Sequence, residues 1–195
     1  MTKTNKFKII ITGCAGFIGF HLALKLLENK SYKIFGIDNI NNYYDTKLKH
    51  DRLNILKKNK NFFFNKIDIC HESKVKNFFN KYKFDYVIHL AAQAGVRNSI
   101  LNPRSYLNSN ILGFFNVIDS SKNIKVRHFI YASTSSVYGD SKKFPLKEEF
   151  DTSSPQSFYA ATKKSNEVIA YSYSNIHKIK TTGLRFFTVY GPYGR

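Results

Sequence analysis

Short runs of β-branched and aromatic residues alternate with longer helical patterns along the whole chain. The strand-like runs cover residues 7–12, 34–37, 62–67, 86–90, 128–132 and 181–187. Apolar residues at helical spacing cover residues 17–29, 46–58, 72–82, about 103–121 and about 157–175. Strands that alternate with helices form parallel sheets, because each helix returns the chain to the same edge. A chain of 195 residues suffices for about one domain, so the sequence predicts an α/β protein with a doubly wound parallel sheet and helices on both faces.

The first predicted strand runs into a glycine-rich turn. The stretch IIITGCAGFIG (residues 9–19) places Gly13, Gly16 and Gly19 between that strand and the first helix. Glycine permits a tight turn and the close approach of a pyrophosphate, which then lies at the helix N-terminus. Asp38 ends the second strand 19 residues after Gly19, near the ~20 expected for the acid that binds an adenosine ribose. Its carboxylate would repel a 2′-phosphate, so we predict a Rossmann-like domain over residues 1–195 that binds NAD in preference to NADP.

A tyrosine and a lysine stand four residues apart in the stretch PQSFYAATKKSNE (residues 155–167). Tyr159 and Lys163 therefore lie on one face of the predicted helix. The pKa of a free tyrosine is ~10, and an ammonium at ~4 Å in a medium of effective dielectric ~20 favours the phenolate by up to ~4 kcal/mol. The pair could thus act as a general base near neutral pH. The stretch YASTSSVYG (residues 131–139), which follows the fifth predicted strand, places hydroxyl groups upstream of the pair.

Composition argues against several other classes. The net charge of +18 suggests a nucleic-acid partner, but the lysines are scattered and no binding motif accompanies them. The excess of Lys, Asn, Ile, Phe and Tyr follows from AT-rich codons, so we expect no nucleic-acid binding. Cys14 and Cys70 are isolated, and no histidine pair has metal-ligand spacing, so we expect neither a disulfide nor a metal site in a cytoplasmic protein. His89, inside an apolar run, is expected in the core. The apolar stretch 9–27 resembles a signal peptide, but its three glycines need another explanation, and no apolar run is long enough for a membrane span.

These motifs resemble the extended short-chain dehydrogenase/reductase family. The G-x-x-G-x-x-G spacing, Thr12 before it, the Y-x-x-x-K pair and the upstream hydroxyl are typical of it. The stretches 39–56, 91–103 and 157–195 resemble the bacterial UDP-glucuronate 4-epimerases of the capsule and lipopolysaccharide type. The resemblance implies that C4 of a nucleotide sugar is oxidised to a ketone, and that the same hydride returns to the other face. Polysaccharide biosynthesis is the implied context.

The resemblance also implies roles for individual residues. The implied catalytic residues are Thr134, Tyr159 and Lys163. The implied cofactor contacts are Gly13, Gly16, Phe17, Ile18, Gly19, Asp38, Asn39, Asp68, Ile69, Leu90, Ala91, Ala92, Asn110, Ser133, Tyr159, Lys163 and Phe187. The implied substrate contacts are Arg97, Thr134, Ser135, Ser136, Thr188 and Arg195, and Arg195 would bind the glucuronate carboxylate.

Several alternatives remain at this point. UDP-glucose 4-epimerases, nucleotide-sugar 4,6-dehydratases and decarboxylases are related enzymes; the dehydratases carry an Asp–Glu pair where this chain has Ser135 and Ser136. The resemblance implies a further C-terminal lobe, so the chain is also consistent with a truncated module that binds NAD without turnover. It implies a homodimer through the helices at about 103–121 and 157–175, and we expect exposed apolar residues there at Val168, Ile169 and Tyr173.

Overall fold

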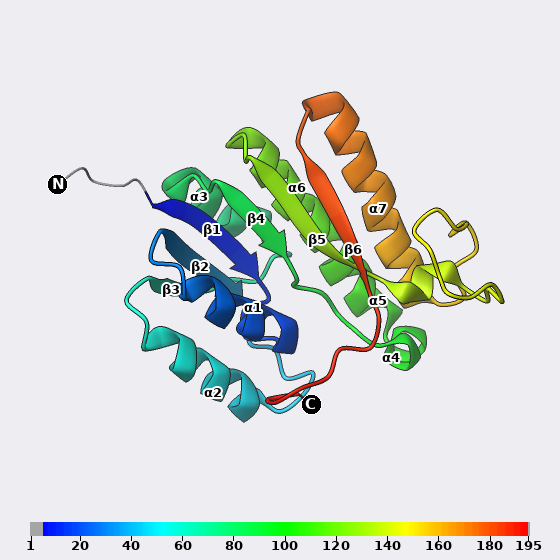
Figure 1. Ribbon diagram of the computed structural model, residues 1–195, viewed down its shortest axis with the longest axis horizontal. Helices are drawn as coiled ribbons and strands as arrows, with labels where there is room; N and C mark the ends of the chain where they lie inside the picture. Colours follow the sequence, from blue (N-terminus) through cyan, green and yellow to red (C-terminus); the bar gives the residue numbers. More distant parts are fainter. Residues whose placement is uncertain (1–5, 195) are drawn as a thin grey trace.

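Each predicted strand is present in the computed structural model, which describes residues 6–194. The strands are β1 (Phe7–Thr12), β2 (Tyr32–Asp38), β3 (Phe62–Lys66), β4 (Tyr86–His89), β5 (His128–Thr134) and β6 (Thr181–Phe186). They form one sheet in the order β3-β2-β1-β4-β5-β6, and all neighbours are parallel (Figure 1). The strand order reverses between β1 and β4, which is the topology of doubly wound dinucleotide-binding folds. The predicted fold class is confirmed.

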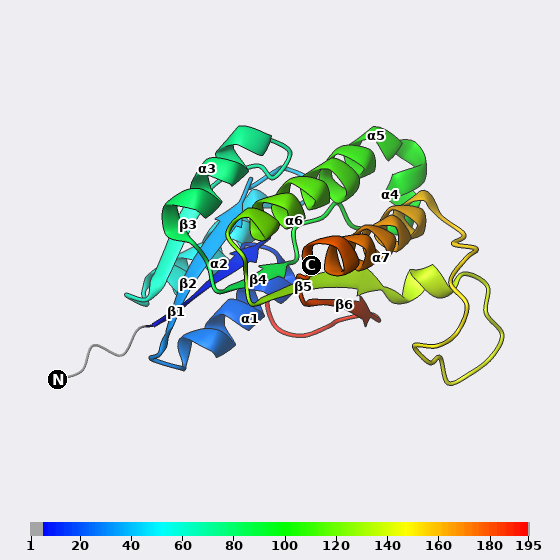
Figure 2. The same cartoon turned by 90° about the horizontal axis from the view of Figure 1, so that it is seen from above.

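Helices cover both faces of the sheet (Figures 1 and 2). One face packs against α1 (Phe17–Leu27) and α2 (Thr46–Lys57), and the other against α3 (Glu72–Tyr82), α6 (Gly113–Asn123) and α7 (Phe158–His177). Successive residues of β1 alternate between the two cores: Ile9 and Ile11 lie in the α1 core, and Ile10 lies in the core beneath α3 and α6. Both faces of β1 are therefore apolar, as expected for a strand inside a parallel sheet.

The predicted helix at about 103–121 differs from the structure in one respect. It is a succession of α5 (Pro103–Tyr106), a π-helical segment (Leu107–Leu112) and α6, preceded by a short helix α4 (Val96–Leu101). Pro103 starts α5 because proline fits the first turn of a helix, where its missing N–H is not needed. Gly113 is the first residue of α6, and it lies very close to Ile69. A Cβ added to Gly113 would lie 2.6 Å from Cδ1 of Ile69.

The chain crosses from β6 towards α1 and α2 after the sheet is complete (Figure 1). His21 Nε2 donates to the carbonyl of Pro192 (2.8 Å), and Arg52 Nη2 donates to the carbonyl of Tyr193. The Tyr193 ring also packs against Phe20, with ring centroids 5.3 Å apart. Residues from both ends of the sequence thus meet beside the glycine turn.

Candidate active site

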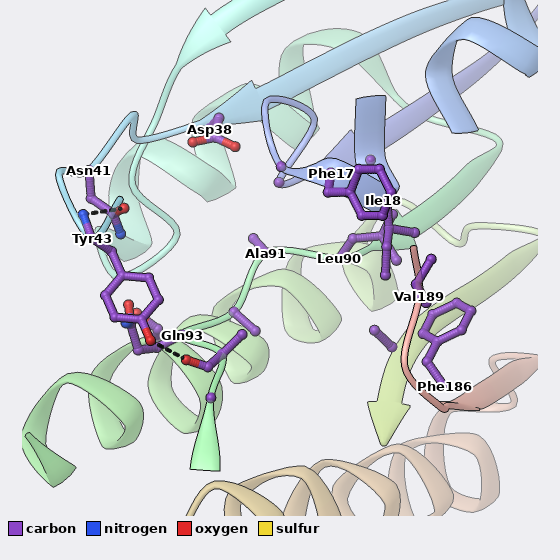
Figure 3. A pocket seen from close by; sticks show the side chains of 18 of the residues that line it. Phe17, Ile18, Asp38, Asn41, Tyr43, Leu90, Ala91, Gln93, Phe186 and Val189 are labelled. Atoms are coloured by element: carbon purple, nitrogen blue, oxygen red, sulfur yellow. Dashed lines mark hydrogen bonds between the residues drawn. The ribbon is translucent and has the colours of Figure 1, made fainter. Parts of the chain in front are cut away.

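A cavity of about 530 Å³ opens at the carboxyl ends of the strands. Its walls come from the β1–α1 turn, the loops after β2 and β4, the end of β5, the start of α7 and the segment after β6 (Figure 3). Its volume lies within the range of small-molecule and cofactor sites, ~300–1,000 Å³. Its position, where the strand order reverses, is where ligands bind in open α/β sheets.

The glycine turn forms one wall through close backbone packing. Gly13 has φ = +74°, a region that side chains disfavour, and an added Cβ would lie 2.7 Å from the backbone nitrogen of Ala91. Gly16 precedes the first helical residue, Phe17, and its N–H donates to the carbonyl of Gly13 (3.0 Å). The first turn of α1 therefore faces the cavity with N–H groups that have no partner within the helix, which suits an anion.

Asp38 lies at the end of β2, beside the glycine turn. Its Oδ2 accepts from the N–H of Ala15 (3.1 Å) and its Oδ1 from the N–H of Ile40 (2.9 Å). Burial raises the pKa of Asp38, while these N–H groups and the nearby charges of Lys49 and Arg52 oppose that rise. The carboxylate thus holds the turn and still lines the cavity, as ribose recognition requires.

The predicted catalytic residues all line this same cavity. Thr134 is the last residue of β5, and its Oγ1 accepts from the N–H of Ser136 (3.2 Å). Tyr159 lies in the first turn of α7, which begins after Ser157, whose hydroxyl accepts from the N–H of Ala160. Lys163 follows one turn later and is only 1% exposed. The cavity therefore combines a hydroxyl, a phenol and an ammonium with the glycine turn.

Burial shifts the two ionisable groups of α7 in opposite directions. It raises the pKa of Tyr159, and a hydrogen bond with Thr134 opposes the rise. It lowers the pKa of Lys163 to about 8, and the carboxylate of Glu167 opposes that fall. The sequence analysis predicted that Lys163 lowers the pKa of Tyr159. In the structure the pKa of Tyr159 is instead raised by burial, and among the described residues it is the hydrogen bond with Thr134 that opposes this rise. In this state both groups favour their neutral forms more than free side chains do.

His89 is a core residue, as predicted. It is 1% exposed, its Nδ1 lies 2.8 Å from Thr12 Oγ1, and its ring stacks near Phe129. Burial and the charge of Lys163 lower its pKa to about 3, so it is neutral at physiological pH. Its role is to link β1 and β4 beneath the cavity.

Most of the residues implied as cofactor or substrate contacts line the cavity. They are Gly13, Gly16, Phe17, Ile18, Gly19, Asp38, Asn39, Ile69, Leu90, Ala91, Ala92, Ser133, Thr134, Tyr159, Lys163, Phe187 and Thr188.

The others are placed elsewhere. Asp68 lies behind Asn39, whose amide donates to it (3.0 Å), and Asn110 is 1% exposed and bonded to both backbone groups of Gln93. Ser135 and Ser136 lie in the 3₁₀ turn after Thr134, and Arg97 is exposed on α4, all outside the cavity lining. Arg195 lies outside the described residues.

The cavity also contains residues that the sequence did not single out. They include Asn41, Tyr43, Tyr44, Lys49, Arg52, Gln93, Gly95, Ser109, Phe186 and Val189 (Figure 3). Arg52 is fully buried: its Nη1 donates to the carbonyl of Ala15 (2.8 Å) and to the hydroxyl of Tyr44 (2.7 Å). The run KLKHDRLNILKKNK (residues 47–60) could have drawn attention to it, because an arginine in an otherwise apolar position of a helix is unusual.

No cluster of three metal-binding side chains occurs within residues 6–194. Over the same range, every helix is too short or too polar to cross a membrane.

Comparisons with known proteins agree with this geometry. The family model described as GDP-mannose 4,6 dehydratase matches residues 10–195. Protein CapI of Staphylococcus aureus is 50% identical over 188 residues, which are 96% of this chain and 56% of CapI. UDP-glucuronate 4-epimerase 2 of Arabidopsis thaliana is 45% identical over 192 residues, 98% of this chain and 44% of that protein.

A solved structure is similarly close. UDP-glucuronic acid 4-epimerase from Bacillus cereus, in complex with UDP-glucuronic acid and NAD, superposes with a TM-score of 0.90 at 37% identity. The match covers 97% of this chain and 59% of that one. The chain thus spans about half of the length of the relatives that it matches.

Proposed function

We propose that this chain is the NAD-binding and catalytic part of a nucleotide-sugar 4-epimerase. The chain belongs to the GDP-mannose 4,6 dehydratase family within the extended short-chain dehydrogenases/reductases. The observation that carries the proposal is that Thr134, Tyr159 and Lys163 line the same cavity as the glycine turn. Cofactor and proton-transfer groups must meet at one carbon for such a reaction, and here one cavity brings them together.

The residues present fit NAD. The backbone of Gly13 lies too close to Ala91 for any side chain. The first turn of α1 lines the cavity, and its N–H groups have no partner within the helix, which suits a pyrophosphate. Asp38 offers a carboxylate for the ribose diol. When bound, NAD supplies a hydride acceptor that can return the hydride to the same carbon.

The protein groups move the proton. Tyr159 Oη takes the proton of the C4 hydroxyl as that carbon is oxidised, and gives it back when the carbon is reduced on its other face. Thr134 Oγ1 hydrogen-bonds the same substrate oxygen. Lys163 has a pKa of about 8 and is therefore largely cationic at neutral pH, so that it can stabilise the phenolate. Ser135 and Ser136 supply no acid–base pair for elimination, which favours epimerisation over dehydration.

UDP-glucuronate is the proposed substrate, with UDP-galacturonate as the product. Support comes from the identity with UDP-glucuronate 4-epimerase 2 and from the Bacillus cereus structure. Thr188 lines the cavity and would face the sugar, whereas Arg195, outside the described residues, would bind the carboxylate. UDP-glucose, which has no carboxylate, is the second candidate, because the cation assigned to the sugar carboxylate, Arg195, lies outside the described residues.

The decisive experiment incubates the longest natural form of the protein with UDP-glucuronate and follows the sugar by proton NMR. We expect UDP-galacturonate to accumulate to equilibrium without added reductant. UDP-glucose is the matched control substrate, since it differs only in having a hydroxymethyl group in place of the carboxylate. Conversion of UDP-glucose alone would favour the second candidate, and NAD retention without any conversion would favour a binding module.

We further propose that the chain forms a homodimer through α6, α7 and the π-helical segment. Exposed apolar side chains gather on these elements, which pack against one another: Leu107 (41%), Leu112 (46%), Phe115 (43%), Val168 (58%) and Tyr171 (71%). Ile169 and Tyr173, also expected to be exposed, are instead partly buried, because both pack against the core beneath α6. Light scattering tests this proposal: Val168→Glu should be a monomer. The control Phe144→Glu changes a loop residue that is 76% exposed, and it should remain a dimer. A monomeric parent protein would contradict the proposal.

A further inference from the structure

A carboxylate behind the cavity joins three elements of the fold. Glu167 lies on α7 four residues after Lys163, and thus on the same helix face. Its Oε1 accepts from Ser133 Oγ (2.6 Å) and Arg185 Nε (2.9 Å), and its Oε2 accepts from Arg185 Nη2 (3.0 Å). The side chains of Glu167 and Arg185 are only 14% and 20% exposed. Such a bidentate, largely buried pair is among the stronger and more directional polar contacts in proteins.

The position of this pair relates it to Thr134. Ser133 and Arg185 are opposite each other in the β5–β6 register, and Ser133 directly precedes Thr134. Arg185 Nη1 also donates to the backbone carbonyl of Glu148 (3.0 Å), and its guanidinium lies 4.9 Å from the centroid of the Tyr138 ring. The pair therefore ties α7, which carries Tyr159, to the strand end that carries Thr134.

The charges around Lys163 are few. Glu167 faces it from α7, neutral His89 from β4, and Tyr159 lies one turn before it. Glu167 is the one carboxylate found to influence Lys163 among the described residues.

Other charged and titratable groups surround Glu167 in turn. Arg185 reaches it from β6, Lys164 Nζ lies 3.6 Å away on α7, and Tyr131 faces it from β5. Arg185 and Lys164 screen part of the field that Glu167 exerts on Lys163, so a moderate effect is expected.

We propose that Glu167, held by Arg185 and Ser133, is a positioning residue for the proposed reaction. It fixes the register of α7 against the end of β5, and it places a negative charge one helical turn from Lys163 that keeps this lysine cationic. The inference rests on the proposed epimerase function, but it concerns residues outside the reacting groups. Glu167 touches neither Tyr159 nor the substrate side of the cavity, and it acts through Lys163 and Ser133.

The test compares Glu167→Gln with the parent in the longest natural form of the protein. Glutamine keeps the size and one acceptor but removes the charge. We expect the alkaline limb of the kcat–pH profile to move down by about 0.5–1 pH unit, because Lys163 then loses its proton more easily. NAD affinity measured by calorimetry should fall at pH 9 more than at pH 7, for the same reason. Glu149→Gln, which removes an exposed carboxylate, is the matched control and should leave both profiles unchanged.

Each outcome decides the inference. Profiles of Glu167→Gln that superpose on those of the parent would overturn it, even if turnover fell, since a purely structural role lowers activity equally at every pH. If Glu167→Gln does not fold, Glu167→Asp decides: it keeps the charge but is too short to reach both Ser133 and Arg185. Its alkaline limb should stay in place while kcat falls about tenfold or more, as expected for misplaced catalytic groups, and parental kcat would overturn the inference. An inactive parent would refute the epimerase function instead, and the calorimetric comparison would still test the effect on Lys163.

Discussion

The glycine turn allows its structural and ligand-binding roles to be separated by two alanine substitutions. Gly13→Ala places a Cβ 2.7 Å from the backbone nitrogen of Ala91 and 2.9 Å from the backbone carbon of Leu90, at φ = +74°. A left-handed conformation costs a non-glycine residue ~1–2 kcal/mol, and overpacking against atoms that cannot rotate away costs a further ~1–3 kcal/mol. Gly13→Ala should therefore lower the free energy of unfolding by about 2–5 kcal/mol, a large part of the usual ~5–15 kcal/mol.

Gly16→Ala is the matched control for stability. Gly16 has φ = −71°, which any residue adopts, and the nearest atom to an added Cβ is the Gly13 carbonyl oxygen at 3.1 Å. Its unfolding free energy should change by less than about 1 kcal/mol. The methyl group would instead stand where a pyrophosphate must approach, so NAD affinity should fall. Urea denaturation without ligand and calorimetric titration with NAD measure the two effects; equal destabilisation by both variants, or unchanged NAD affinity in Gly16→Ala, would refute this reasoning.

Three further predictions concern substitutions of residues that line the cavity. Tyr159→Phe should lower kcat by about 10²–10⁴-fold and leave the melting temperature near that of the parent. Thr134→Val should lower kcat less, because the general base remains. A larger fall in kcat for Thr134→Val than for Tyr159→Phe would contradict the role of Tyr159 as the base. Asp38→Ala should weaken NAD binding by about 10–100-fold and relax discrimination against NADP, because it removes charge-assisted hydrogen bonds and a repelling carboxylate; calorimetry with both nucleotides measures this. Lys163→Met should stabilise the fold by up to about 2–3 kcal/mol at pH 7 and by little at pH 10.5. The native pKa of Lys163, about 8, lies below its unfolded value, so the native state binds fewer protons between these two pKa values. The stability of the parent protein therefore rises with pH in this range. Urea denaturation measures the stability difference between Lys163→Met and the parent, and a difference that is the same at pH 7 and pH 10.5 would disprove this prediction.

The periodic features of the sequence predicted the fold because they depend on local properties. Apolar runs and their spacing predicted all six strands, and Gly13, Gly16 and Gly19 predicted the turn and its cavity. The Tyr159–Lys163 spacing predicted a shared helix face, which α7 provides. The break between α5 and α6 was missed because the π-helical segment has apolar spacing that also fits a regular helix.

Other site features depend on contacts between distant segments. Arg52 was not singled out from the sequence, yet it is fully buried because its guanidinium bonds the carbonyls of Ala15 and Tyr193, which lie 37 and 141 residues away in sequence. The incomplete prediction of the cavity lining has the same cause. Asn110 was assigned to the cavity from a resemblance, but its amide bonds Gln93 and Thr162 and lies behind the wall. The apolar periodicity of one segment cannot predict hydrogen-bond partners that lie in distant segments.

Burial explains why the proposed catalytic groups depend on residues outside the reacting centre. It raises the pKa of Tyr159 and lowers that of Lys163, so desolvation alone disfavours the charged pair that proton transfer needs. The opposing contribution to Lys163 comes from Glu167, whose carboxylate is in turn stabilised by Arg185 and the hydroxyl of Ser133. A cavity with the same lining but an uncharged residue at Glu167 would therefore still accept a dinucleotide, while its lysine would lose the proton at lower pH. The protonation of Lys163 thus depends on the junction of α7, β5 and β6 as well as on its burial at the cavity.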